Sequence, residues 1–126
     1  MISLFEKKEF TIDDLNSLIR NKTEEGVYLE FKSSESISKE DERKIELSRD
    51  VSAFANADGG ILIYGLSEKK GKASKISFIS NEPYTKEWLQ QVIDSRIERL
   101  ITNLQIHPIT NPENDKEQIF ILKIPA

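Results

Sequence analysis

The sequence predicts a single α/β or α+β domain, in which about three helices pack on a mixed β-sheet. The chain has 126 residues, the usual length of one domain and too short for two. Helical and strand patterns are mixed along it, and the C-terminal end has the pattern of a hairpin. No linker, internal repeat or low-complexity tract divides it. We therefore expect a helical lead-in over about residues 1–24 and a core over 25–126.

The N-terminal part predicts one short helix and one half-buried strand. Residues 11–14 have the form of a capping box, with Asp14 in place of the usual Glu, and predict a helix to about Asn21. Residues 27–32 alternate strictly between apolar and polar, which predicts a strand with two unlike faces. Its apolar face holds Val27, Leu29 and Phe31, and its polar face holds Tyr28, Glu30 and Lys32.

The middle of the chain predicts a second helix and a buried strand. Residues 33–39 are polar and rich in serine, so we expect a mobile loop there. A helix follows from Ser38 to about Ala57, and Gly59 and Gly60 end it. Residues 61–66 form a short apolar run that is typical of a central strand. The apolar residues expected from the helix are Ile45, Leu47, Val51, Phe54 and Ala55.

The last third of the chain predicts a strand, the longest helix and a hairpin. A lysine-rich loop is expected to lead into a strand over residues 75–79. Thr85 is expected to cap a helix that extends to Leu104. Residues 106–110 and 118–124 predict two strands joined by the turn-rich segment 111–115. The apolar positions with helical spacing are Leu89, Val92, Ile93, Ile97, Leu100, Ile101 and Leu104.

Composition excludes several kinds of site. The absence of cysteine excludes disulfides, thiolate metal centres and cysteine nucleophiles, and it fits a cytoplasmic protein. The single histidine, His107, excludes a multi-histidine metal site, and we expect it to pack rather than to catalyse. There is no apolar run of membrane-spanning length and no signal peptide, so we expect no membrane partner. Gly59 and Gly60 follow a helix instead of preceding one, so we expect no ATP site within this segment.

The charge pattern allows only a local contact with nucleic acid. The 18 basic and 22 acidic residues give a net charge of −4, which weighs against binding by bulk charge. One segment is nonetheless basic, with lysines at Lys69, Lys70, Lys72 and Lys75. Two interpretations stay open: a contact with phosphates, or a solvated loop that keeps the protein soluble.

Three carboxylates are candidates for a metal site. Glu30 and Lys32 share the polar face of the first strand, where an acid could bind a metal and a lysine could polarise a phosphoryl group. Glu25 lies five positions before Glu30, and Gly26 between them could bend the chain so that both carboxylates meet. Glu68 could be a third ligand. Gathered carboxylates would bind Mg²⁺ or Mn²⁺; the alternative is three unrelated surface acids.

Three segments in order carry a family resemblance. They are Glu25-x4-Glu30-Phe31-Lys32, the run from Ser52-Ala53-Phe54-Ala55-Asn56 to Gly59-Gly60, and the apolar strand that ends at Gly65. From Glu25 to Gly71, and more loosely beyond, the chain resembles the AlbA-like domain of the Schlafen family. The resemblance implies a nucleic-acid-interacting domain, with RNA favoured over DNA. Nuclease members of that family are metal-dependent endoribonucleases that act on structured RNA such as tRNA.

The resemblance also implies roles for residues. Glu25, Glu30 and Glu68 would be catalytic metal ligands for Mg²⁺ or Mn²⁺, and Lys32 would contact phosphate; Glu68 stands where the family typically has Asp. The alternatives are a non-catalytic DNA- or RNA-binding regulatory domain of a larger protein, or an oligomerisation module. We expect a homodimer, because two related Schlafen lobes form a cradle for nucleic acid and a single lobe would need a partner. The abrupt end at Ala126 predicts a missing C-terminal region.

Overall fold

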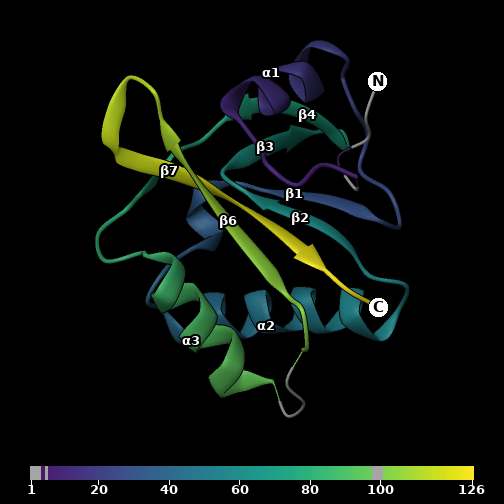
Figure 1. Cartoon of the computed structure of the whole chain (residues 1–126), viewed down its shortest axis with the longest axis vertical. Coiled ribbons are helices and arrows are strands. Elements are labelled where there is room, and N and C mark those ends of the chain that lie inside the picture. Colours follow the sequence, from purple (N-terminus) through teal and green to yellow (C-terminus); the bar gives the residue numbers. More distant parts are fainter. Residues whose placement is uncertain (1–3, 5, 98–100) are drawn as a thin grey trace.

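The computed structural model describes residue 4, residues 6–97 and residues 101–126, and it has the predicted class: a mixed sheet packed by helices (Figure 1). β1 pairs in parallel with β2, and β2 pairs antiparallel with the long strand β7. β5 and β6 also pair antiparallel with β7. The strands of this sheet are β1 (Leu29–Lys32), β2 (Gly60–Tyr64), β5 (Ile79–Ser80), β6 (Gln105–Asn111) and β7 (Asn114–Ile124).

Two different layers cover the two faces of the sheet (Figure 1). One layer is formed by α2 (Asp41–Asn56) and α3 (Lys86–Arg96). The other is formed by α1 (Ile12–Arg20) and the small hairpin of β3 (Leu66–Lys69) and β4 (Lys72–Ile76). Because side chains alternate along a strand, β2 contributes to both cores. Leu62 and Tyr64 pack with α2 and α3, whereas Ile61 and Ile63 pack with α1.

Glycine and the predicted caps fix where these elements end. Gly59, just after α2, has a φ of +78°, and a Cβ there would lie 2.4 Å from the backbone oxygen of Ile124. Glycine is therefore required for the chain to turn from α2 into β2 beside the end of β7. The predicted N-caps are confirmed: the Asp14 carboxylate accepts from the Thr11 N–H at 2.8 Å, and the Thr85 hydroxyl accepts from the Trp88 N–H at 3.0 Å.

The first half of the chain departs from the prediction at four places, one of which is that α2 begins at Asp41 instead of Ser38. The first strand begins at Leu29 instead of Val27, because Gly26 and Leu29 hydrogen-bond to each other and close a turn that leaves Val27 74% exposed. Residues 33–39, expected to be a mobile loop, contain a short 3₁₀ helix, η1 (Ser34–Ser36), and the buried Ile37. Ile45, expected in the core, is exposed on the outer side of α2.

The lysine-rich segment is a hairpin and not a loop. Lys70 and Gly71 both have positive φ, 54° and 79°, as a two-residue turn between antiparallel strands requires. The lysines before and after that turn therefore lie on strands. The strand predicted over 75–79 is accordingly divided between β4 and β5, with residues 77–78 between them.

The longest predicted helix is shorter than its apolar pattern. α3 ends at Arg96, and Ile97 is extended, with φ −107° and ψ 124°. Ile101 and Leu104 still pack against the core without being helical, so core contact and not helical continuity explains their apolar character. Leu100 lies outside the described residues.

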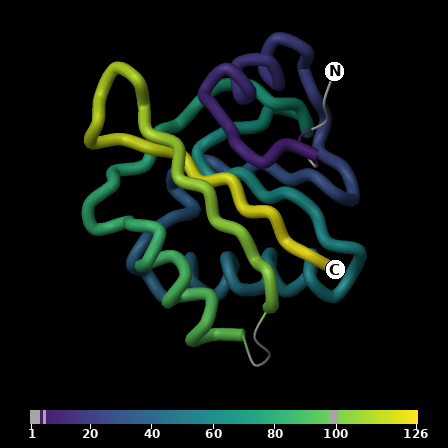
Figure 2. The backbone as a smooth tube through the Cα atoms, in the orientation of Figure 1, coloured from purple at the N-terminus to yellow at the C-terminus, as the bar shows by residue number. Residues whose placement is uncertain are grey.

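The C-terminal hairpin of β6 and β7 is confirmed, with β7 beginning earlier than predicted, at Asn114. Figure 2 shows its turn and the C-terminal residue at opposite ends of β7. Within the described part of the chain, no helix is both long enough and apolar enough to span a membrane.

Candidate functional site

Glu25 lies at the outer edge of β1. The carbonyls of Tyr28 and Lys32 accept hydrogen bonds from the neighbouring segment at Ile61 and Gly65. Because backbone groups of successive residues point to alternate sides of a strand, the N–H of Phe31 points away from the sheet. The Glu25 carboxylate accepts that N–H at 2.9 Å. The Glu25 N–H in turn donates to the Gly71 oxygen at 2.7 Å. Glu25 therefore joins the edge of β1 to the β3–β4 hairpin and covers a backbone donor that would otherwise be open to strand pairing.

Two of the sequence-predicted carboxylates, Glu30 and Glu68, act electrostatically on the third, Glu25. Burial raises the pKa of Glu25, and repulsion from Glu68 and Glu30 raises it further, while the hydrogen bond from Phe31 and the nearby Lys32 oppose the shift. The bend at Gly26 thus brings Glu25 into the electrostatic range of both partners. The repulsion gives the predicted acidic site a measurable consequence at Glu25.

Each of these carboxylates nevertheless has a different nearest partner. Glu68 accepts the Gly71 N–H at 2.6 Å within its own hairpin, and Glu30 lies 3.4 Å from the Lys32 ammonium. Carboxylate oxygens suit Mg²⁺ and Mn²⁺ chemically. As placed, however, the three do not fit one ion: in the residues that the structure describes, no group of three His, Cys, Asp or Glu side chains could hold a metal. The metal site stays a prediction.

Lys32 lies between carboxylates from two elements. Its ammonium nitrogen is 3.4 Å from Glu30 on β1 and 3.9 Å from Asp50 on α2. Burial lowers the pKa of Lys32, but Asp50, Glu30 and Glu46 together outweigh burial and raise it. The Lys32 ammonium is therefore positioned by two carboxylates at the C-terminal end of β1.

Asp50 and Tyr64 are two members of this group that sequence reasoning missed. The Asp50 side chain is 25% exposed, and burial raises its pKa, against the attraction of Lys32. Tyr64 is fully buried on β2, where it is the register partner of Lys32. A signal for Asp50 was present, because it lies three residues after Leu47 and four before Phe54, on the apolar side of the predicted helix.

The lysines of the basic segment project from the β3–β4 hairpin. Lys69 and Lys72 are partners across the two strands, and Lys70 occupies the turn. Lys72 also lies 3.8 Å from Glu24, an exposed ion pair. All four lysines, including Lys75, are exposed. The hairpin thus gathers them on one projecting element, whereas Lys32 belongs to the separate group with Glu30 and Asp50.

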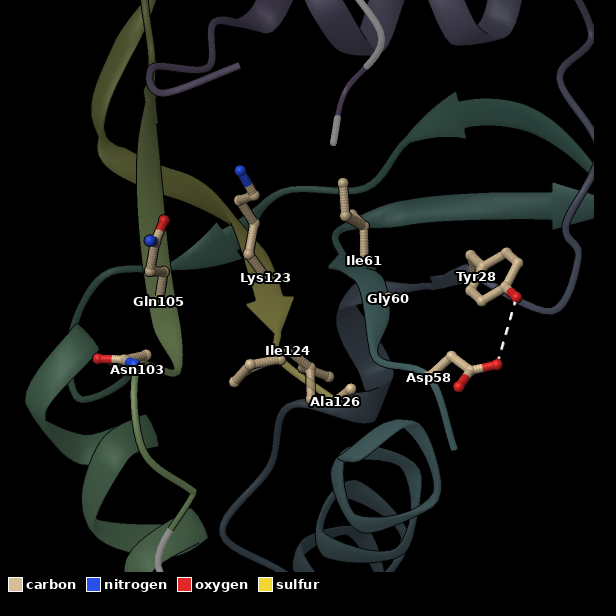
Figure 3. Close-up of a pocket in the computed structure, with 10 residues that line it drawn as sticks. Tyr28, Asp58, Gly60, Ile61, Asn103, Gln105, Lys123, Ile124 and Ala126 are labelled. Carbon is tan, nitrogen blue, oxygen red and sulfur yellow. Dashed lines mark hydrogen bonds between the residues drawn. The ribbon is translucent and has the colours of Figure 1, made fainter. Parts of the chain in front are cut away.

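His107 packs as expected, with its ring edge-to-face against Phe10 at a centroid distance of 5.0 Å. A cavity of about 460 Å³ lies elsewhere, at the end of β7 (Figure 3). Its wall includes Lys123, Asn103 and the pair formed by Tyr28 and Asp58, whose oxygens are 3.4 Å apart. None of the sequence-predicted site residues lines it, so the candidate chemistry and the cavity are separate features.

Comparison with known proteins gives one family and two solved structures of similar fold. Residues 25–126 match the family described as Schlafen, AlbA_2. The fold is similar to the N-terminal domain of an ATP-dependent DNA helicase RecG-related protein from Nitrosomonas europaea, with a TM-score of 0.57 and 17% identity over 94% of this chain and 74% of that one. It is also similar to the DIP2311 protein from Corynebacterium diphtheriae, with a TM-score of 0.53 and 18% identity over 91% of this chain and 25% of that one. No curated protein matches the chain.

Proposed function

Because the chain belongs to the Schlafen AlbA_2 family, we propose that it is a nucleic-acid-binding domain that contacts phosphates through its β3–β4 hairpin. The observation that carries the proposal is the hairpin itself, which presents four exposed lysines: Lys70 in the two-residue turn and Lys69, Lys72 and Lys75 on the two strands. The description of one solved neighbour as DNA-helicase-related supports a nucleic-acid context. RNA is the favoured class, because the carboxylate motif resembles that of Schlafen proteins acting on structured RNA.

Binding by this hairpin is expected to be local and sensitive to salt. The protein carries a net charge of −4, so its overall field repels a polyanion and only short-range contacts can hold one. Charges separated by more than about 8 Å are largely screened at physiological ionic strength. Each phosphate contact releases counterions, so affinity should fall steeply as salt rises.

The decisive variant reverses three hairpin lysines: Lys69, Lys70 and Lys75 to Glu. Lys72 is kept, because replacing it would place a second glutamate against Glu24. We expect at least about a tenfold loss of affinity for a fluorescent RNA hairpin at low salt, measured by anisotropy. The matched control is Lys116→Glu, an exposed lysine on the β6–β7 hairpin. Equal affinity in the triple variant and the control would leave the hairpin as a solubilising element and refute the proposal.

A second candidate function, a Mg²⁺- or Mn²⁺-dependent endoribonuclease, is favoured by the electrostatic coupling of Glu25 with Glu68 and Glu30. Activity of this kind requires these side chains to exchange their present partners for an ion. Incubation of the domain with tRNA, with and without Mn²⁺, tests it, and Glu30→Gln is the control for contaminating nuclease. Without cleavage that depends on Glu30, the domain is a non-catalytic binding module.

A further inference from the structure

Tyr64 presents a buried hydroxyl that packing alone does not explain. The residue is fully buried, and its hydroxyl has no hydrogen-bond partner among the described residues. The preceding β2 positions, Ile61 to Ile63, are all aliphatic and fill the two cores without polar atoms. An unpartnered buried hydroxyl costs free energy that an apolar ring would avoid. A partner available in another state of the protein would account for it.

That hydroxyl is on the same side of the sheet as the group of charges around Lys32. Tyr64 and Lys32 are register partners on parallel strands, so their side chains are on the same face of the sheet, under α2. Burial raises the pKa of the Tyr64 hydroxyl, and the charges of Asp50, Glu30 and Glu46 raise it further. Asp50 and Glu30 are also the two carboxylates that hold the Lys32 ammonium. The buried Tyr64 hydroxyl and the Lys32 ammonium are therefore influenced by the same two carboxylates.

We propose that Asp50 and Tyr64 are positioning residues for Lys32: Asp50 holds the ammonium at the end of β1, and the Tyr64 hydroxyl donates to Asp50 when Lys32 turns to a phosphate. The inference rests on the proposed function, since the phosphate is that of a bound nucleic acid. It extends the contact from the β3–β4 hairpin to the α2 side of the sheet.

The exchange compensates for what phosphate binding would otherwise cost. If Lys32 moved from the carboxylates with nothing to replace it, a half-buried Asp50 would lose its nearest cation. The Tyr64 hydroxyl, buried on the same side of the sheet and within the electrostatic influence of Asp50, supplies a charge-assisted hydrogen bond at that moment. The same hydroxyl has no acceptor while Lys32 is held, which explains why it is unpartnered here.

A double-mutant cycle tests the role of Asp50. Asp50→Asn removes a negative charge, and by charge alone this should strengthen RNA binding. If Asp50 positions Lys32, the substitution should instead weaken RNA binding, by about threefold or more, and only while Lys32 is present. Lys32→Ala should reduce the slope of log affinity against log salt by about 1. In the Lys32→Ala background, Asp50→Asn should no longer weaken binding. The matched control is Glu42→Gln, which removes an exposed acid from the first turn of the same helix.

Tyr64→Phe tests the hydroxyl separately, because it removes one oxygen and keeps the ring. We expect the variant to melt at the same or a higher temperature and to bind the RNA hairpin about threefold more weakly, again only with Lys32 present. Unchanged affinity, or equal effects of both variants in the two backgrounds, overturns the inference while the proposed function stands. A wild-type protein that binds no RNA overturns both.

Discussion

Glu25 combines a structural task with an unfavourable charge. Its carboxylate accepts the Phe31 N–H at the edge of β1, which favours the folded state. Burial, with repulsion from Glu68 and Glu30, raises its pKa and disfavours the ionised form. A carboxyl group with a raised folded-state pKa contributes stability that is complete below its unfolded value of 4.5 and is lost as the pH rises through the folded value.

Glu25→Gln should therefore stabilise the protein at pH 7. The amide oxygen can still accept the Phe31 N–H, and the charge is removed. We expect a gain of at most about 0.5 kcal/mol, because the side chain is partly solvated and its repulsion is screened. The gain should vanish near pH 3.5, where the carboxyl is neutral, and thermal melts across this range would show it. Glu113→Gln, on the exposed β6–β7 turn, is the control, and a destabilised Glu25→Gln at pH 7 would contradict the prediction.

Metal binding is tested best at Glu30 and Glu68. If carboxylates share an ion, Mn²⁺ at about 100 times its dissociation constant should stabilise the native state by about 2.7 kcal/mol. Glu30→Gln should abolish that response. Glu68→Asp introduces the residue typical of the family, and we expect it to strengthen the metal response and any cleavage. Melting temperatures that are insensitive to Mn²⁺ in all three proteins would identify the acids as surface and edge charges.

The turn from α2 into β2 depends on one glycine. Gly59 has a positive φ, and a Cβ there would overlap the backbone oxygen of Ile124 on β7. Gly59→Ala should destabilise the protein by about 2 kcal/mol or more, since backbone strain and overlap act together. Gly26→Ala is the matched control, because a Cβ at Gly26 meets nothing within 4 Å. Chemical denaturation measures the stability of both variants. Similar unfolding midpoints would contradict the prediction and show that the end of β7 shifts to admit the added Cβ at little cost.

The lysine-rich segment shows how an element changes the interpretation of a motif. In a loop, four lysines would be independent, solvated charges. In the β3–β4 hairpin, the partners Lys69 and Lys72 are held across two strands that pack on the sheet through Leu66 and Ala73. Fixing like charges together has an electrostatic cost, which an anion would relieve. The hairpin thus favours the phosphate-contact interpretation without testing it.

At the level of the whole molecule, the predicted homodimer is untested. β1 ends the sheet on one side, where Glu25 and Gly26 satisfy part of its outer backbone edge. α3 and the β6–β7 hairpin are therefore the candidate surfaces for a two-fold contact. We expect a dimer mass by light scattering at about 100 μM, within the range of weak symmetric association. A monomer mass across a dilution series from that concentration would contradict the expectation.

The sequence by itself determined the class, the central strand, the caps at Thr11 and Thr85 and the C-terminal hairpin, because periodicity and capping are local properties of the chain. It also proposed Glu25, Glu30 and Glu68 as candidate metal ligands, which stays a prediction. Only the tertiary structure decided that α3 ends at Arg96 and that Val27 is exposed, since apolar spacing does not say which neighbour an apolar side chain meets. The same holds for the group of Lys32, Asp50 and Tyr64, which come from β1, α2 and β2. Their proximity follows from sheet register and helix docking, which depend on long-range packing. Residue spacing places Asp50 on the apolar side of its helix, but it does not say that Lys32 and Tyr64 meet it there.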